Sequence, residues 1–512
     1  MKIYSNGFYY LVEGDNLGDI AKELEIYSRD KPTSPFVEIG PHKSFSSAFS
    51  TNVIRILNKI GISNITSFEK VKIFDVNDKY DIDELVEIDY SKEFNRQIVS
   101  YPSSFSFTDP ALITELSKWG ISFDDEEYAY YKNLFNNLRR DPTFIELFDL
   151  CQSNSEHSRH WFFRGNLVKD KFKINQSLFS MIKKTNTKSS NSVIAFSDNS
   201  SAIKGYEVFS LNHTKSPIEI KKTQLDLVFT AETHNFPTLV YPFEGAATGI
   251  GGRIRDNHAT GRGAHLTAGT AGYSVGLLSN SGVGNYPSPL KILIEASNGA
   301  SDYGNKIGEP IINGFTRSFG MDIKYKVSTG IFSSIIVSKR IEYIKPIMFT
   351  GGIGYMHREH IHKYEPQEGM LVIRIGGPVY KIGLGGGFAS SIEQGGEFKS
   401  FEKSAVQRGD PQYENKLNRV ITEMILLGKH NPIVSIHDQG AGGLANVVKE
   451  IVYPKGANIE LSNVTLGDSS LQGLEIWCSE FQESDVLLIK NKDYNILAES
   501  CKKEGGIIDM LG

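Results

Sequence analysis

The stretch that decides the fold is "LDLVFTAETHNFPTLVYPFEGAATGIGGRIRDNHATGRGAH", residues 225–265. Its first ten residues alternate as a β-strand does, which places Glu232 and His234 on one face and Thr233 on the other. An acid and an imidazole at the end of a strand lie where α/β proteins commonly bind ligands. A solvated strand end with a surface ion pair explains the same residues.

The segment "GAATGIGGRIRD" predicts a glycine-rich loop that binds phosphate, although its spacing fits neither a P-loop nor a dinucleotide fingerprint. Glycines let backbone N–H groups converge on an anion. Arg253, Arg255 and Arg262 can each pair with phosphate oxygens, and Asp256 offers a hard oxygen ligand for Mg²⁺.

Two other polar segments could carry chemistry. In "CQSNSEHSRH", His157 and His160 stand at the end of a predicted helix, where a histidine serves as a cap, a core residue or a catalyst. In "IVSIHDQGAGGLANVVKEIV", an apolar strand runs into His437 and Asp438, and a glycine turn and a helix follow. This arrangement is expected for a metal–phosphate site, and Asp438 as a plain helix cap is an equal alternative.

Composition indicates a soluble globular protein of several domains. The chain has 512 residues, 40% hydrophobic and 22% charged, and its net charge of -5 gives no reason to expect nucleic acid or an anionic membrane as partner. No apolar run reaches the roughly 20 residues that a membrane helix needs, and the first residues lack the features of a signal peptide. We therefore expect a cytoplasmic location, which the three cysteines, too few for a disulfide framework, also favour.

Periodicity and turn signals predict a mixed α/β fold. The second helix within 124–160 should have Asp141 as its N-cap and Pro142 in its first turn. The predicted elements are strands over 34–40, 192–197, 225–234, 290–297, 370–377 and 485–490, and helices over 16–28, 45–62, 415–428 and 444–453, with two more within 124–160.

Seven segments, in this order, resemble the formylglycinamide ribonucleotide amidotransferase (phosphoribosylformylglycinamidine synthase) family in its large, single-chain type. They are "NSEHSRH", "ETHNFPTLVYPFEGAATGIGGRIRD", "TGRGAHLTAGTAGY", "IEASNGASDYGNKIGEP", "VQRGDPQYENKLNRV", "SIHDQGAGGLANVVKE" and "LEIWCSEFQES". The similarity covers essentially the whole chain. It departs at His42, where arginine is usual, at Ser158, where many members have cysteine, and at Phe236, where the small bacterial type has histidine.

The resemblance implies four parts. These are a small N-terminal α+β domain (1–115), a helical linker carrying "NSEHSRH" (116–170), an aminoimidazole-ribonucleotide-synthetase-like N-terminal α/β domain with a glycine-rich ATP loop (171–345), and its C-terminal α/β partner, truncated (346–512). Large members continue into a second synthetase half and a glutaminase domain. We therefore expect this chain to be the N-terminal portion of a longer protein or one product of a split gene.

The implied reaction belongs to purine biosynthesis. ATP activates the amide of formylglycinamide ribonucleotide as an iminophosphate, and ammonia taken from glutamine then displaces phosphate and gives the amidine. Two alternatives stand beside this ligase reading. One is aminoimidazole ribonucleotide synthetase or a similar relative, against which "NSEHSRH" and the N-terminal domain speak. The other is a non-catalytic homologue or fragment that acts as a binding protein.

The resemblance also implies roles for individual residues. His157 and His234 match active-site histidines, His234 being the proton acceptor, and Glu232, Asp256 and Asp438 match Mg²⁺ ligands. Substrate contacts match Thr233, His234, Asn235, Phe236, Arg255, Gln407, Glu480, Phe481 and Gln482. The ATP-binding segment matches Gly245, Ala246, Ala247, Thr248, Gly249, Ile250, Gly251, Gly252, Arg253, Ile254, Arg255 and Asp256.

Overall fold

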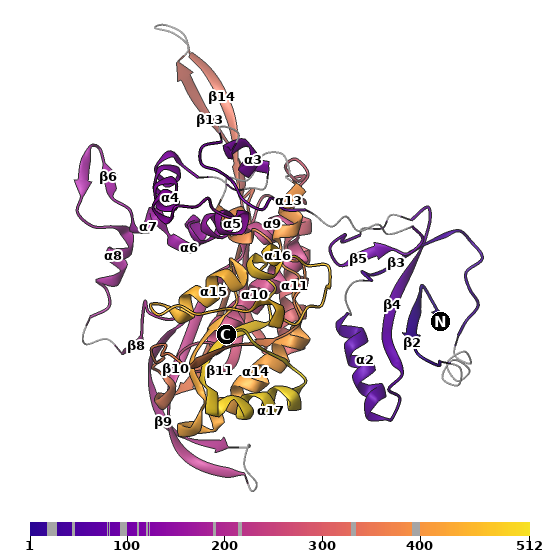
Figure 1. Ribbon diagram of the computed structural model, residues 1–512. Coiled ribbons are helices and arrows are strands. Elements are labelled where there is room, and N and C mark those ends of the chain that lie inside the picture. Colours follow the sequence, from indigo (N-terminus) through magenta and orange to yellow (C-terminus); the bar gives the residue numbers. More distant parts are fainter. Residues whose placement is uncertain are drawn as a thin grey trace. The chain divides into compact units, whose positions relative to one another are not determined.

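The chain divides into two compact units. Unit 1 comprises Met1–Tyr101 with Val379–Lys381 and Leu466–Gln472, and unit 2 comprises Pro102–Pro378, Ile382–Thr465 and Gly473–Gly512. The computed structural model (Figure 1) describes residues 1–17, 28–43, 47–78, 80, 82–92, 100–109, 112–118, 121, 123–187, 191–212, 218–328, 334–391 and 400–512. The helix expected over 16–28 falls almost entirely outside these residues.

Unit 1 contains an antiparallel sheet of five strands in the order β1-β2-β4-β3-β5. Ser47 caps helix α2 by accepting a hydrogen bond from the Ser50 N–H, and α2 packs on β4. The expected strand over 34–40 and helix over 45–62 are confirmed as β3 and α2. The elements are β1 (Lys2–Ser5), β2 (Phe8–Gly14), β3 (Phe36–Pro41), α2 (Ala48–Lys59), β4 (Ile65–Asp75) and β5 (Glu87–Asp89).

Unit 2 begins with helices α3 (Leu112–Lys118), α4 (Asp125–Leu138), α5 (Phe144–Ser153), α6 (Glu156–Arg159) and α7 (Trp161–Arg164). The predicted N-cap of α5 is wrong, because Thr143 caps the helix in place of Asp141. The Thr143 hydroxyl accepts from the Glu146 N–H, and the Glu146 carboxylate accepts from the Thr143 N–H. Asp141 lies two residues too early for this reciprocal capping.

A six-stranded sheet forms the first half of unit 2, in the order β12-β11-β15-β10-β9-β8. Helices α10 and α11 pack on its central strands β11 and β15 through a core of small and aliphatic side chains. The strands are β8 (Ser192–Ile194), β9 (Ser201–Asn212), β10 (Glu219–Thr233), β11 (His265–Val275), β12 (Ile311–Ser318) and β15 (Ile347–His357), and the helices are α9 (Asn235–Val240), α10 (Pro242–His258) and α11 (Pro289–Ile307). Short elements before this sheet are β6 (Leu167–Lys169), β7 (Phe172–Ile174) and α8 (Leu178–Lys183).

The strand predicted over 290–297 is wrong, because this segment lies in α11. Ser288 caps the helix, Pro289 occupies its first position, and Ile292, Ala296 and Ala300 are buried. Spacings of four residues place these side chains on one helical face. A short apolar run does not by itself distinguish a strand from a buried helix.

The predicted glycine-rich loop is also wrong as a conformation, since residues 245–256 lie inside helix α10. Backbone N–H groups in the interior of a helix already bond to the helix's own carbonyls, so they cannot converge on a phosphate. The glycines instead allow close packing. A Cβ at Gly245 would lie 2.2 Å from the Pro237 carbonyl carbon, and one at Gly251 would lie 2.8 Å from the Tyr303 ring.

The second half of unit 2 is a four-stranded antiparallel sheet in the order β17-β18-β16-β19, with α14 and α17 packed against it. The strands and helices predicted within 370–490 are confirmed. The strands are β16 (Met370–Gly376), β17 (Ile433–Asp438), β18 (Ser484–Lys490) and β19 (Ile507–Met510). The helices are α12 (Gly386–Ser391), α13 (Ser400–Ala405), α14 (Pro411–Leu426), α15 (Gly443–Val452), α16 (Gly473–Cys478) and α17 (Tyr494–Glu504), with 3₁₀ turns η1 (Arg358–His360), η2 (Gly428–His430), η3 (Leu461–Asn463) and η4 (Asn491–Asp493).

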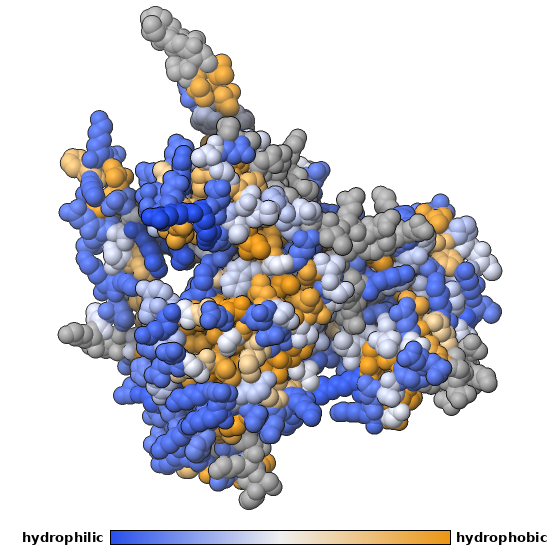
Figure 2. All heavy atoms as spheres, viewed as in Figure 1, coloured by the Kyte–Doolittle hydropathy of each residue, from blue (hydrophilic) through white to orange (hydrophobic). Residues whose placement is uncertain are grey.

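A two-stranded hairpin, β13 (Gly320–Ser328) and β14 (Ser334–Glu342), projects from the rest of unit 2 (Figure 1). Apolar side chains on both strands are exposed, and they appear in orange along the projection in Figure 2. The most exposed of them are Met321, Tyr325, Ile335 and Ile336.

Candidate active site

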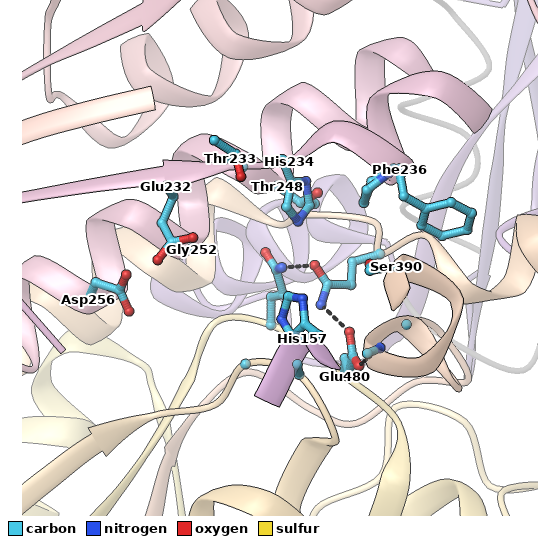
Figure 3. Close-up of a pocket in the computed structure, with 18 of the residues that line it drawn as sticks. His157, Glu232, Thr233, His234, Phe236, Thr248, Gly252, Asp256, Ser390 and Glu480 are labelled. Carbon is cyan, nitrogen blue, oxygen red and sulfur yellow. Dashed lines mark hydrogen bonds between the residues drawn. The ribbon is translucent and has the colours of Figure 1, made fainter. Parts of the chain in front are cut away.

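A cavity of about 500 Å³ in unit 2 brings together segments that are distant in the sequence (Figure 3). Its walls come from α6, the end of β10, α9, α10, α12, the end of β17 and the turn after α16. The residues that sequence analysis selected and that line it are His157, Glu232, Thr233, His234, Asn235, Phe236, Thr248, Gly249, Gly252, Arg255, Asp256, Gln407, Asp438, Glu480 and Gln482.

The end of β10 delivers three consecutive residues to the cavity. Thr233 is the last strand residue and pairs with Phe349 of β15, after which His234 leaves the strand with φ -123° and ψ 56°. All three residues line the cavity because the extended backbone ends there.

The imidazoles of His234 and His157 enter the cavity from opposite sides in Figure 3. His234 Nδ1 lies 2.5 Å from the Gly245 carbonyl oxygen, so Nδ1 carries the proton that this bond requires and Nε2 keeps its lone pair. Burial, followed by the charges of His157 and Arg255, lowers the pKa of His234 to about 4. Burial also lowers the pKa of His157, whose backbone N–H donates to Ser391 Oγ at 3.0 Å.

The three carboxylates expected to bind Mg²⁺ all line the cavity. Burial raises the pKa of Asp256 well above its usual value, and the nearby charges of Asp438 and Glu232 act in the same direction. Burial and the charge of Asp438 likewise raise the pKa of Glu232, although a hydrogen bond with Asp256 opposes the shift. Despite burial, the hydrogen bond and charge of His437 lower the pKa of Asp438.

This carboxylate cluster fits a hard divalent cation, because Glu232 and Asp256, whose mutual hydrogen bond requires a proton, would both ionise beside Mg²⁺. Among the residues that the structure describes, no three His, Cys, Asp or Glu side chains are arranged to hold a metal ion in common. The fit therefore rests on pairs of carboxylates completed by phosphate oxygens, which is how Mg²⁺ usually binds beside a nucleotide.

One of the three arginines expected to bind phosphate, Arg255, lines the cavity. Its guanidinium lies 3.4 Å from Glu414 and 4.0 Å from Asp438. Arg253 points the other way and forms two hydrogen bonds of 2.5 Å with the buried Glu309 carboxylate. Neither Arg253 nor Arg262 lines this cavity, and Arg262 borders another one instead.

Helical periodicity explains how the expected ATP segment divides. Thr248, Gly252, Arg255 and Asp256 are spaced three or four residues apart or adjacent, so they share the face of α10 that lines the cavity. The opposite face packs into the core through Ala246, Ala247, Ile250 and Ile254.

Glu480 connects three parts of the cavity wall. Its carboxylate accepts hydrogen bonds from the Gly387 N–H at 3.0 Å, from the Gly442 N–H at 2.9 Å and from Gln407 Nε2 at 2.7 Å (Figure 3). Gln482 in turn donates to the Gln407 side-chain oxygen. Phe481, expected beside them, is 1% exposed and lies under the Arg374 guanidinium instead of lining the cavity.

Sequence reasoning did not select every residue of the wall. His160 and His437 were noted in their motifs, although no role was assigned to either. Lys345 and Asn199 stand in segments without a pattern, although burial lowers the pKa of Lys345 and its Nζ lies 3.5 Å from the Ser390 carbonyl oxygen. The lining residues to which sequence analysis gave no role are His160, Pro237, Asn199, Lys345, Gly386, Gly387, Ser390, Ala405, His437, Gly440, Ala441, Asn446 and Glu450.

We expect Gly252→Ala and Gly245→Ala to have opposite effects on stability. A Cβ at Gly252 would meet its nearest atom at 3.6 Å, an ordinary contact, so the gain in helix propensity should raise the free energy of unfolding by about 0.5–1 kcal/mol. The Cβ at Gly245 would collide with the Pro237 backbone, and overpacking of this kind should lower the free energy of unfolding by about 1–3 kcal/mol or more. Urea unfolding followed by circular dichroism measures both, and shifts of the same sign would contradict the packing role of Gly245.

Two family models match the chain. One is the C-terminal domain of AIR synthase related proteins, over residues 367–511, and the other is the linker domain of formylglycinamide ribonucleotide amidotransferase, over residues 112–160. A probable phosphoribosylformylglycinamidine synthase of Arabidopsis thaliana is 43% identical over 98% of this chain. The phosphoribosylformylglycinamidine synthase of Homo sapiens is 41% identical over 95% of it.

The chain belongs to the phosphoribosylformylglycinamidine synthase family. It spans 37% of the length of the Arabidopsis protein, 36% of that of Dictyostelium discoideum and 38% of the human protein. The solved structure of Thermotoga maritima PurL complexed with FGAR matches the fold, with a TM-score of 0.50 and 23% identity over 75% of this chain and 51% of that one. The expected family and the expected mixed α/β fold with synthetase-like domains are thus confirmed.

The cellular compartment of this family member stays a prediction. The Arabidopsis relative is named chloroplastic/mitochondrial. In the part of the chain that the structure describes, the helices are too short or too polar to cross a membrane.

Proposed function

We propose that the chain contributes the first synthetase half of an ATP-dependent ligase that converts formylglycinamide ribonucleotide to its amidine with ammonia derived from glutamine, a step of purine biosynthesis. One observation carries the proposal. A single cavity gathers His157, His234, Arg255 and the carboxylates from motifs that lie far apart in the chain. Relatives at 41–43% identity that carry the synthase name support the same reaction.

The chemistry explains this set of residues. An amide oxygen leaves poorly, so phosphoryl transfer from ATP to that oxygen would first give an iminophosphate. Ammonia would then add to the carbon, lose a proton and expel phosphate. Both steps depend mainly on positioning and on neutralising charge. Mg²⁺ held by pairs of the carboxylates Glu232, Asp256 and Asp438 would supply cationic charge to the phosphate oxygens.

The side chains of this chain would act as follows. The bond from Nδ1 to the Gly245 carbonyl holds the His234 ring so that Nε2 can accept the proton from the attacking nitrogen. Arg255, held by Glu414, would face the transferred phosphoryl group. The Glu480–Gln407–Gln482 network would orient Gln407 toward the ribonucleotide.

We also propose the four-part division at 1–115, 116–170, 171–345 and 346–512. The family matches to 112–160 and 367–511 support the second and fourth parts. A second synthetase half and a glutaminase, on the same or a separate polypeptide, would complete the enzyme, and the glutaminase would supply ammonia.

Calorimetric titration tests the binding part of the proposal on this chain. We expect Mg²⁺-dependent binding of ATP that Asp438→Asn weakens by at least about tenfold, since a carboxylate ligand of Mg²⁺ is removed. Asp322→Asn on the exposed hairpin is the matched control and should bind as the wild type does. Amidine formation from ATP, the ribonucleotide and ammonium should appear when the chain is joined to a relative's remaining length. Absence of both ATP binding and turnover would favour the alternative that the chain is a non-catalytic homologue.

A further inference from the structure

A second cavity, of about 710 Å³, shares no lining residue with the first. Its walls come from the segment after α10, from η1 and the connection to β16, and from η2, β17 and η4. We call it the seam cavity, because elements of both the six-stranded and the four-stranded halves of unit 2 line it. Its volume lies within the range of roughly 300–1,000 Å³ that is typical of small-molecule sites.

Arg262 forms the buried basic wall of the seam cavity. The residue is 7% exposed, and its guanidinium donates to the carbonyl oxygens of Glu359 at 2.8 Å and Ile433 at 3.4 Å. Its Nε is buried and has no hydrogen-bond partner among the described residues. Asn431 fixes the backbone of Arg262 by donating to its carbonyl oxygen at 3.1 Å.

The charge of Arg262 is therefore left without a carboxylate contact among the described residues. Two other buried arginines of unit 2 differ, because Arg253 pairs with Glu309 and Arg374 with Asp509. Carbonyl oxygens satisfy N–H groups but carry no net charge, so a buried guanidinium bonded to them still attracts an anion.

The rim of the seam cavity adds three exposed lysines, Lys429, Lys490 and Lys492. Two carboxylates, Glu359 and Asp493, also line the cavity. With Arg262, four cationic side chains stand against these two acids, so the local charge favours an anionic ligand.

Tyr364 supplies a flat surface beside the cationic wall. Its ring centroid lies 4.9 Å from the Arg262 guanidinium carbon, and the side chain is 55% exposed. One ring face thus packs on the arginine, and the exposed part is open to a planar group. A phosphate ion alone would leave most of the cavity and this ring without a contact.

We propose that the seam cavity binds a phosphorylated ligand of nucleotide size. The phosphate pairs with the rim lysines and is attracted by the uncompensated charge of Arg262 beside them, and a planar ring packs on Tyr364. The proposal concerns a site beyond the proposed amidation and is independent of it, since the two cavities share no residue.

Isothermal titration calorimetry with AMP and with inorganic phosphate tests the proposal. We expect AMP to bind, and both Arg262→Gln and the double variant Lys429→Ala with Lys492→Ala to weaken its binding by about tenfold or more, because each removes positive charge that attracts the phosphate. Tyr364→Ala should weaken AMP but not phosphate. Lys306→Ala, an exposed lysine on α11, is the control and should leave the affinity unchanged.

The rim and Tyr364 variants keep the test valid even if Arg262→Gln unfolds the protein, because these side chains are exposed. If millimolar AMP gives no heat of binding, or if these variants bind AMP as tightly as the wild type does, the proposed site is refuted. If phosphate and AMP bind with equal affinity, the proposal that the ligand is of nucleotide size is refuted.

Discussion

Replacement of His234 by alanine is expected to abolish amidine formation from ATP, the ribonucleotide and ammonium. Loss of a general base typically lowers turnover by about 10²–10⁴-fold. His234 is the imidazole whose proton is fixed on Nδ1 by the Gly245 carbonyl, which leaves Nε2 to accept a proton from the attacking nitrogen. Steady-state release of phosphate and amidine, with the chain joined to a relative's remaining length, measures the effect.

The matched control for this prediction is His362→Ala, because His362 is exposed and lies outside both cavities. It should keep the wild-type rate. Urea unfolding of His234→Ala separates a catalytic loss from a folding loss, since His234 also precedes helix α9. Wild-type turnover in His234→Ala would refute the proposed proton acceptor.

Arg253→Ala is expected to destabilise the protein by about 3–5 kcal/mol, because it leaves the Glu309 carboxylate buried without its partner. The side chains of Arg253 and Glu309 are 0% and 1% exposed. A carboxylate in that position must either stay charged in a medium of low dielectric constant or take up a proton. Urea unfolding at pH 7 measures the free-energy difference.

Arg419→Ala provides the comparison, because the Arg419–Glu504 pair has the same 2.5 Å separation while Arg419 is 60% exposed. A surface pair of this kind should cost about 0–1 kcal/mol. A double variant, Arg253→Met with Glu309→Leu, should recover much of the loss because no charge then stays buried. Equal losses for Arg253→Ala and Arg419→Ala would show that burial of the pair is not what matters.

Alternation and short apolar runs in the sequence were enough to predict some of the strands. The alternation before Glu232 predicts β10, and the apolar run before Asp438 predicts β17. Helix α10 was not predicted because its four glycines lower the helix propensity of the segment. Gly245 and Gly251 are nevertheless required there, since a Cβ at either position would collide with a neighbouring residue. Tertiary packing overrode the local preference, and no single segment contains that information.

The candidate site was predicted through motifs rather than through geometry. Motifs point to Glu232, Asp256 and Asp438 separately, and the fold brings them together. Lys345 and Asn199 were missed because each lies alone in its segment and meets the others only through contacts between distant parts of the chain. A motif also does not show which of its residues reach the site. Arg253 and Arg255 belong to the same motif, but residues two apart on a helix point in different directions.

The exposed hairpin β13–β14 bears on the colloidal behaviour of the chain. Extended strands with apolar side chains tend to pair with other extended chains, and charged side chains at intervals along a strand oppose this. Lys324 and Lys326 on one strand and Lys339 and Arg340 on the other interrupt the apolar residues and are exposed. Like-charge repulsion between copies is screened as ionic strength rises. We therefore expect pairing between copies through this hairpin to become easier as the salt concentration rises.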